Sequence, residues 1–495
     1  MASGTQYTVD STRTLNVLPD EFYTPFFSNL SKNRRADPIR ALLPLEQRPG
    51  VISLLAGKPN AETFPITALQ YTISDPAGSS AGTTIALSPE DLAVGLQYNH
   101  TAGLPELVEW VYGLQEDVHG RRKGEGWRVS IGVGSSDLIY KAVSTLVNPG
   151  DAVLIEAPVY AGIIPMFQVL DCEFVEVDTD AHGIRSQSLR TILENWPPAK
   201  PKPKVLYTVP YGCNPTGMTA TLERRLEVLA LAREHNFLIL EDDAYFYLYF
   251  GDAPRPPSYF ALDAAQPEVG RVVRFDSLSK VISSGMRIGF ISAPASIVDA
   301  IDIHTQNANL QGPTFSQLLA VRLLQTWGHA GFQTHTARVA QFYRAKRDVF
   351  ERLLRTHLAG LVEWTTPEAG MFFWFKLLLG DAGSPTLRKS SARRRSARRA
   401  RAAGHGVPAQ RAQDRVRARG VQPAAAGAGR RGAAAAARGH PRRAPVPRGG
   451  RSGGEFDRWR RRDRVDLCVA VVRPYFNRAF DTIKGVASPN IRVVC

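Results

Sequence analysis

Residues 272–292, VVRFDSLSKVISSGMRIGFIS, contain two short apolar segments with a lysine between them. Val272–Phe275 and Gly289–Ser292 have the length and the β-branched and aromatic content of buried strands. Amphipathic stretches typical of helices, such as Ser136–Val147 and Thr221–Glu234, occur upstream. They alternate with three more apolar segments of the same kind: Ala152–Ile155, Lys204–Val209 and Phe237–Leu240. We therefore predict an α/β fold with a mostly parallel central sheet.

The pattern changes further along the chain. Residues 315–357 have a long helical pattern, and two predicted strands follow, Val362–Thr365 and Met371–Leu379. This change predicts a second, smaller domain. We expect an N-terminal arm at 1–50 that also contributes to the smaller domain, a large domain at 51–310, the start of the smaller domain at 311–380, an Arg/Ala/Gly/Pro-rich block at 381–465 and a C-terminal remnant at 466–495.

The positive charge of the chain, +15 in total, is concentrated in the block at 381–465. That block holds 24 of the 61 Lys and Arg residues and 5 of the 46 Asp and Glu residues, so the rest of the chain has a net charge of −4. We therefore expect no nucleic-acid partner. The composition of the block predicts disorder. A shifted reading frame and a genuine basic arm both explain it, and sequencing the transcript distinguishes them.

Other counts limit the class of protein. No run approaches the roughly 18 apolar residues that span a bilayer, so we expect no membrane partner. Asp10, Asp20 and Glu21 argue against a secretory signal at the N-terminus. The four cysteines form no CxxC pair, which fits a reducing compartment, and we expect a cytoplasmic protein. No residues with metal-ligand spacing are evident, so we predict no metal site.

Lys280 lies just after the predicted strand that ends at Phe275, among small hydroxyl residues. Lysine is the side chain that forms Schiff bases with aldehydes. Ser277, Ser279 and Arg287 supply the hydroxyl and guanidinium donors that bind a phosphate dianion. A solvated surface lysine is the structural alternative. The SxxK signature of Ser–Lys acylating enzymes is another, but it lacks SDN and KTG partners downstream.

Two more polar motifs follow predicted strands. Phe237–Leu240 leads into three carboxylates that include Asp242, and open α/β sheets bind ligands beyond the carboxyl ends of their strands. An acid at that edge can pair with a protonated ring nitrogen, act as a base or hold a metal. The turn YGCNPTG (211–217) follows Lys204–Val209 and fixes the side chain of Asn214. A plain strand–helix connection is the alternative for this turn.

A third motif, GVGSSD (132–137), lies between a predicted strand and a predicted helix. Hydroxyls and free amides at a helix N-terminus make an anion site, although Asp137 stands where a dinucleotide fingerprint needs glycine. Together the motifs describe one ligand, pyridoxal 5′-phosphate (PLP). The matching residues are Ser135, Ser136, Ser277, Ser279 and Arg287 for the phosphate, Tyr160 for stacking on the ring, Asp242 for the ring nitrogen, Asn214 and Tyr245 for the phenolic oxygen, and Lys280 for the aldehyde.

With these residues the sequence resembles the fold-type I PLP-dependent aminotransferases of class I/II, and within them the 2-aminoadipate, kynurenine and aromatic amino acid branch. The resemblance implies a large α/β domain with a smaller, here incomplete, α/β domain. It also implies transamination of an aromatic amino acid, kynurenine or 2-aminoadipate with 2-oxoglutarate. It covers about residues 20–380 and rests on ISLLAGKPNAETFP (52–65), LQYNHTAGLPEL (96–107), YTVPYGCNPTG (207–217), FLILEDDAYFYL (237–248), DSLSKVISSGMRIGF (276–290) and TPEAGMFFWFKL (366–377).

The resemblance also implies individual roles. Lys280 would carry the cofactor and act as the base of the 1,3-proton shift, assisted by Asp242 and Tyr160 as catalytic residues. Tyr98 would reach the phosphate bound by a partner subunit, which implies a homodimer. Ser136 stands where relatives often have Gln. The expected substrate-binding residues are Gly57 near the substrate carboxylate, Arg40 at the entrance, Asn214, and Arg492 at the C-terminus.

The C-terminus departs from the family pattern. Such enzymes end in a strand whose arginine binds the substrate α-carboxylate, whereas here the block at 381–465 replaces the expected continuation. SPNIR (488–492) resembles that arginine motif faintly, and it makes Arg492 the candidate. Loss of such a charge-assisted contact costs about 1.5–3 kcal/mol. We therefore expect the chain to bind PLP but to transaminate poorly.

Other functions remain as alternatives. A lyase or synthase of the same fold type would use the same cofactor residues, and dependence on a 2-oxo acid distinguishes it. A PLP-binding transcription regulator would need a winged helix-turn-helix, for which the 50 residues before Val51 are too few. A pseudoenzyme that binds nucleic acid through its basic block would be expected to have aromatic residues in that block, which has none from Asp381 to Glu455.

Overall fold

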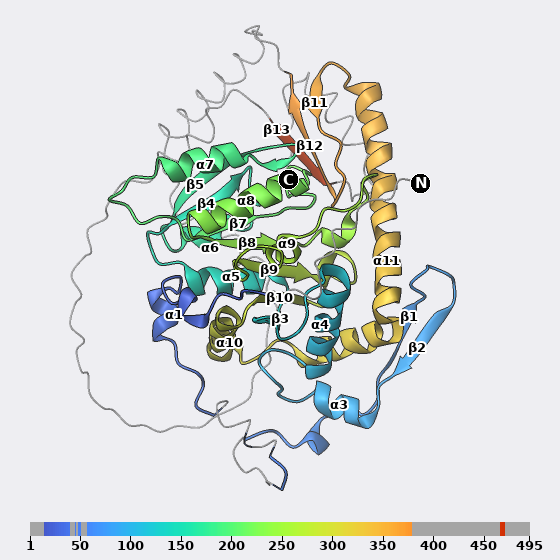
Figure 1. The fold of residues 1–495 in the computed structure, drawn as a ribbon. Helices are drawn as coiled ribbons and strands as arrows, with labels where there is room; N and C mark the ends of the chain where they lie inside the picture. The colour runs from blue at the N-terminus through green and yellow to red at the C-terminus, as the bar shows by residue number, and fades with distance from the viewer. Residues whose placement is uncertain (1–13, 40–44, 46–47, 51–56, 379–465, 471–495) are drawn as a thin grey trace, which may run out of the picture. The chain divides into compact units, whose positions relative to one another are not determined.

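Five of the predicted strands belong to one eight-stranded sheet in a computed structural model, which describes residues 14–39, 45, 48–50, 57–378 and 466–470 (Figure 1). Five neighbouring strands run parallel, and β10 runs antiparallel to both of its neighbours. The mostly parallel sheet is thus confirmed. In spatial order the strands are β3 (Trp127–Gly132), β10 (Gly289–Pro294), β9 (Val272–Ser277), β8 (Leu238–Asp242), β7 (Val205–Thr208), β4 (Ala152–Ala157), β5 (Glu173–Asp180) and β6 (Gly183–Ile184).

The central strands are buried along their whole length. Every residue of β7, β8, β9 and β10 is buried, as expected where helices cover both faces of a sheet. Two groups of helices form these layers (Figure 1). One group consists of α4 (Pro105–His119), α7 (Ser186–Glu194), α8 (Leu222–Glu234) and α9 (Tyr259–Asp263), and the other of α5 (Ser135–Leu146), α6 (Ile164–Gln168) and α10 (Ala295–Asn309).

Helix ends follow the local sequence. The side chain of Thr221 accepts a hydrogen bond from the Arg224 amide and starts α8, as predicted from the sequence. The long helical pattern corresponds to α11 (Thr314–His357), which Gly328 interrupts with φ 63° and ψ 178°. The sequence analysis did not predict this break. Within the described ranges, no helix is both long and apolar enough to cross a membrane.

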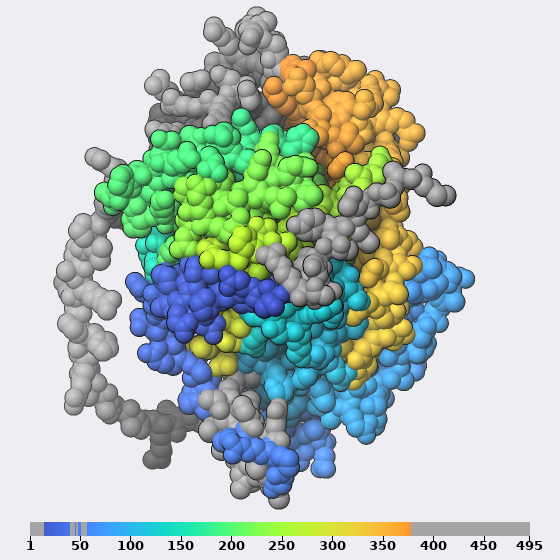
Figure 2. Space-filling view, in the orientation of Figure 1, coloured from blue at the N-terminus to red at the C-terminus, as the bar shows by residue number. Residues whose placement is uncertain are grey.

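The described N-terminal residues pack on the large domain. Val17 forms a parallel bridge with Val269, and the Tyr23 hydroxyl donates to the Gly270 carbonyl at 2.8 Å. Ser28 starts α1 (Asn29–Asn33) and donates to the Ser144 carbonyl in α5. Figure 2 shows this segment as a dark-blue layer against the yellow part of the chain. The division into domains stays a prediction.

A separate three-stranded antiparallel sheet includes the two strands that were predicted for the smaller domain. Its strands are β11 (Val362–Trp364), β12 (Phe372–Leu377) and β13 (Asp466–Ala470), with β12 in the middle. β13 lies beyond the basic block, so the remnant at 466–495 supplies a strand of this sheet. The block at 381–465, for which the sequence predicts disorder, lies outside the residues that the structure describes.

Two further elements lie near the start of α11. The strands β1 (Gln70–Ser74) and β2 (Gly82–Ala86) form an antiparallel hairpin, and α3 (Pro89–Gly95) follows it. The Trp327 indole donates to the Ser74 carbonyl, and Arg322 pairs with Asp91, so the first half of α11 holds both elements.

Candidate active site

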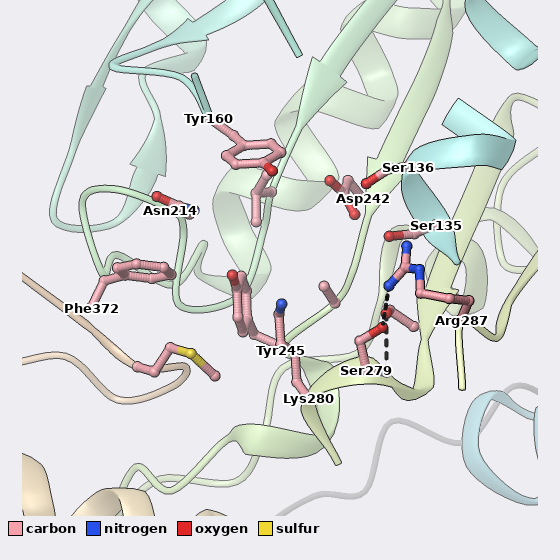
Figure 3. Close-up of a pocket in the computed structure, with 14 residues that line it drawn as sticks. Ser135, Ser136, Tyr160, Asn214, Asp242, Tyr245, Ser279, Lys280, Arg287 and Phe372 are labelled. Carbon is pink, nitrogen blue, oxygen red and sulfur yellow. Dashed lines mark hydrogen bonds between the residues drawn. The ribbon is translucent and has the colours of Figure 1, made fainter. Parts of the chain in front are cut away.

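A pocket opens where β7, β8 and β9 end, beside the N-terminus of α5 (Figure 3). The structure thus brings strand ends and a helix start together, as ligand sites in open α/β sheets require. Ten of its fourteen lining residues are those that the sequence assigns to PLP: Ser135, Ser136, Tyr160, Asn214, Asp242, Tyr245, Ser277, Ser279, Lys280 and Arg287. The four that the sequence analysis did not name are Val209, Ala244, Met371 and Phe372.

Lys280 ends the short helix η5 (Leu278–Lys280), which directly follows β9. The Ser277 hydroxyl accepts a hydrogen bond from the Ser279 amide at 3.2 Å and so fixes the turn from strand to helix. The Leu278 amide donates to the Ile288 carbonyl, which ties the same turn to the start of β10. Figure 3 shows the Lys280 amine directed into the pocket, beside Tyr245. A fully buried strand therefore fixes the backbone from which the amine projects.

Asp242 is the last residue of β8 and is only 6% exposed. Burial raises the pKa of its carboxyl to about 6, while a hydrogen bond from Tyr207 and the charge of Lys280 oppose that rise. Its Oδ2 accepts the Tyr207 hydroxyl at 2.7 Å, and its Oδ1 is buried with no donor among the described residues. An unpaired buried carboxylate oxygen is costly, so Asp242 is well suited to accept an N–H bond from a ligand.

The anion cup is formed by the start of α5 and by Arg287. Gly134 has φ 80° and immediately precedes Ser135 at the helix N-terminus. A Cβ on Gly134 would lie 2.5 Å from the Arg287 guanidinium, and one on Gly289 would lie 2.5 Å from the Ser135 amide. The backbone contact leaves no room for a side chain at Gly289, and the positive φ of Gly134 favours glycine there. The guanidinium donates to Ser279 Oγ at 3.4 Å, which brings cation, hydroxyl and helix amides to one place.

The walls of the pocket are aromatic and apolar. Tyr160, from the segment after β4, and Tyr245, from the segment after β8, both line it. Burial raises the pKa of the Tyr245 hydroxyl, which also hydrogen-bonds Asn214. Phe372 of β12 packs edge-on against Tyr245, with ring centroids 5.8 Å apart. β12 of the three-stranded sheet therefore supplies part of one wall, and this contact could not be predicted from the local sequence.

Comparisons with known proteins agree with this geometry. The family profile for aminotransferase class I and II matches residues 95–378. The chain belongs to this aminotransferase family. Among its relatives is the aminotransferase tdiD of Emericella nidulans, 46% identical over 359 residues, which are 72% of this chain and 82% of that protein. The mitochondrial kynurenine/alpha-aminoadipate aminotransferase of Bos taurus is 40% identical, over 72% of this chain and 84% of its own.

Solved structures place the aminotransferase in the same group. An aminotransferase from Candida albicans superposes with a TM-score of 0.69 at 26% identity, covering 77% of this chain and 86% of its own. A kynurenine aminotransferase from Pyrococcus horikoshii, solved with PMP, has a TM-score of 0.54 at 29% identity, over 74% and 86% of the two chains. Members of this family use PLP and catalyse transamination between amino acids and 2-oxo acids, and so does this enzyme.

The pocket of this aminotransferase fits PLP by its own chemistry. Asp242 Oδ1 has no donor within the described part of the chain, and a protonated ring nitrogen supplies one. The cup at Ser135 and Arg287 presents donors for a phosphate, and Lys280 presents an amine for the aldehyde. No group of three or more His, Cys, Asp or Glu side chains suited to a metal ion occurs in the part of the chain that the structure describes.

Four predicted site residues are not among those that line this pocket. Tyr98 is 52% exposed, and Gly57 is exposed with open space around it. Arg40 and Arg492 fall outside the described residues. The four lining residues that the sequence analysis did not assign to the site all lie in quoted motifs, which carried a signal for them: Val209 in 207–217, Ala244 in 237–248, and Met371 and Phe372 in 366–377.

Proposed function

We propose that this aminotransferase transfers the amino group of an aromatic amino acid, kynurenine or 2-aminoadipate to 2-oxoglutarate. The observation that carries the proposal is the convergence of Lys280, Asp242 and the Arg287 cup in one pocket, with an aromatic wall beside them. The names of the relatives, which are kynurenine/alpha-aminoadipate and aromatic aminotransferases, support this substrate range.

We assign a role to each polar group of the pocket. Bound PLP supplies an electron sink that stabilises negative charge at the substrate α-carbon. Lys280 Nζ carries the proton of that carbon through the 1,3-proton shift. It can do so because its amine projects into the pocket from a fixed turn. Asp242 Oδ1 holds the ring N–H, and Arg287 with Ser135, Ser136, Ser277 and Ser279 binds the phosphate. Asn214 and Tyr245 orient the phenolic oxygen, and Tyr160 stacks on the ring.

The apolar wall supports the aromatic members of this proposed substrate range. Met371 and Phe372 line the pocket beside the Tyr245 ring. Burial of an aromatic side chain there contributes roughly 25 cal/mol for each Å² removed from water. A pocket wall of this kind favours kynurenine and aromatic amino acids over small ones.

A panel of donors tests this function. The protein, loaded with PLP, is given kynurenine, phenylalanine, 2-aminoadipate or alanine, each with and without 2-oxoglutarate, and glutamate formation is measured. Glutamate that forms with the first three donors, and only with 2-oxoglutarate, supports the proposal. Repeated turnover without any 2-oxo acid, beyond one product molecule for each bound PLP, would indicate a lyase and contradict it. The variant Lys280→Ala controls for reactions that need no lysine.

Four assignments concern residues outside the pocket. We propose that Gly57 and Arg40 border the substrate site and that Arg492 binds the α-carboxylate. Replacing Arg492 by Met then raises the KM for every donor about tenfold or more, and an unchanged KM would remove the assignment. We also propose a homodimer in which Tyr98 contacts the phosphate bound by its partner, and sedimentation of the holoenzyme as a monomer would contradict it.

We propose a cytoplasmic location. The described cysteines, Cys172 and Cys213, are free thiols, which supports a reducing compartment. The mammalian relatives are named as mitochondrial proteins. Fractionation of cells that express the tagged chain tests the proposal, and recovery with mitochondria would overturn it.

A further inference from the structure

The two oxygens of Asp242 have different surroundings. Oδ2 accepts a hydrogen bond from the Tyr207 hydroxyl at 2.7 Å, whereas Oδ1 is buried with no donor among the described residues. Tyr207 is fully buried in β7 and does not line the pocket, while Asp242 does. The hydroxyl therefore reaches the carboxylate from inside the sheet, on the side opposite to a ligand.

We propose that Tyr207 is a positioning residue for transamination: its hydroxyl fixes the Asp242 carboxylate so that Oδ1 alone faces the ligand, and it keeps that carboxylate charged. This inference rests on the proposed pairing of Asp242 with the ring nitrogen of PLP. Tyr207 itself touches neither cofactor nor substrate, so it acts only through Asp242.

The strand register explains why this tyrosine reaches that acid. β7 and β8 are parallel neighbours in which Tyr207 pairs with Leu240 and Thr208 with Glu241. Burial, followed by the charge of Asp242, raises the pKa of the Tyr207 hydroxyl well above its ordinary value. The hydroxyl consequently stays protonated over the working pH range, and it can only donate to Asp242.

Opposing effects act on the pKa of the Asp242 carboxyl. Burial and the neighbouring Asp276 raise the pKa of its carboxyl, while Tyr207 and the Lys280 amine lower it. The Tyr245 hydroxyl faces it too, and the charge of Asp242 raises the pKa of that group.

A second buried acid, Glu156, lies on β4. Burial raises the pKa of Glu156 to about 7, and the charge of Asp242 adds to that rise. Glu156 accepts hydrogen bonds from the Val209 amide at 2.8 Å, from Thr208 Oγ1 at 2.9 Å and from Cys213 Sγ at 3.2 Å. The donors near Glu156 are thus committed to it, and Tyr207 is the side-chain donor that serves Asp242 from within the sheet.

Removing the hydroxyl has a definite consequence for the ligand. Without this donor the pKa of the Asp242 carboxyl rises above its value of about 6, because a hydrogen bond to the charged form lowers a carboxyl pKa. The proton shared by Asp242 and the ring nitrogen then moves toward the carboxylate. A ring nitrogen without its charge withdraws electrons less well, so kcat falls while substrate docking, and hence KM, changes little.

The test reads the ring nitrogen directly. Tyr207→Phe holoenzyme is loaded with PLP isotopically labelled at the ring nitrogen, and the NMR shift of that nitrogen is followed against pH beside the wild type. We expect a displacement toward the unprotonated form, PLP binding weakened roughly tenfold, and a loss in kcat with little change in KM. The matched control is Tyr23→Phe, which removes the hydroxyl of another buried tyrosine; that hydroxyl donates to a backbone carbonyl at 2.8 Å, and Tyr23 does not line the pocket.

Two more measurements keep the inference falsifiable if Tyr207→Phe folds poorly. A ring-fluorinated tyrosine placed at position 207 keeps the shape but donates more strongly, so the nitrogen shift should move in the opposite direction. In an Asp242→Asn background, Tyr207→Phe should have no further effect on the nitrogen shift. Equal shifts in Tyr207→Phe, its control and the wild type would overturn the inference while leaving PLP bound at Lys280. A wild type that binds no PLP would overturn both this inference and the proposed site.

Discussion

Replacement of Arg274 by Met tests how the strand ends under the pocket are held. Arg274, on β9, is fully buried and donates to both oxygens of Asp276 at 2.8 Å. It also forms ion pairs with Asp243 and with Glu241, the latter at 3.3 Å. Glu241 and Asp243 flank Asp242 at the end of β8, and Asp276 precedes Ser277 at the end of β9. One guanidinium therefore connects the two strand ends that carry the proposed catalytic groups.

The expected cost follows from that geometry. Removing one partner of a buried ion pair leaves an uncompensated charge and costs about 3–5 kcal/mol, and here three carboxylates lose their cation. Burial already raises the pKa of Asp243 and of Asp276, and Arg274 opposes the rise. In the variant these pKa values rise further above the unfolded values. A carboxyl whose pKa is raised in the folded state stabilises the protein at low pH, and this contribution is lost as the pH rises. The loss of unfolding free energy in Arg274→Met, relative to the wild type, is therefore larger at about pH 8 than at about pH 5.

Urea unfolding of the apo protein at both pH values measures this effect. The control Arg190→Met removes a surface arginine that pairs with Glu194 and Glu234, and it should cost far less, because solvent screens such pairs. An Arg274→Met variant within about 1 kcal/mol of the wild type, or one whose deficit does not change with pH, would refute the reasoning.

Three more predictions follow from single residues. Burial raises the pKa of Glu156 from 4.5 to about 7. Between these pH values the folded state holds a proton that the unfolded state has lost, so the protein loses stability as the pH rises through this window. Glu156→Gln should remove up to about 3 kcal/mol of that loss, measured in denaturation curves of the apo protein. Gly212 has φ 51° and an added Cβ would lie 2.5 Å from Ala369, so Gly212→Ala should lower the thermal midpoint far more than Gly360→Ala, where the added Cβ meets open space. Arg287→Met should weaken PLP binding about tenfold or more in a fluorescence titration, with Arg287→Lys in between.

Much of the fold was predictable because its signals are local. The central strands are short apolar runs that end in polar motifs, and five of them were located from the sequence to within two or three residues. Lys280 and Asp242 could be placed in one site because both follow strand ends, and parallel strands end at the same edge of a sheet.

Other features depend on contacts between distant segments. The sequence of β12 does not show that Phe372 packs against Tyr245, and the pairing of β12 with β13 spans the whole basic block. Tyr207 lies in an otherwise apolar run, and only the register of two strands brings its hydroxyl to Asp242. Arg274 was a missed signal: a charged residue inside a predicted buried strand requires buried partners.

Locating the cofactor on the chain tests the central claim most directly. The protein is incubated with PLP, reduced with borohydride, digested and analysed by mass spectrometry, with and without prior addition of kynurenine. The account predicts that Lys280 carries the phosphopyridoxyl group after reduction. Kynurenine added before reduction should prevent this label, because the cofactor then leaves Lys280 as pyridoxamine phosphate while the matching 2-oxo acid forms. A label on another lysine, or a Lys280 label that persists when an amino acid donor is added before reduction, would contradict it.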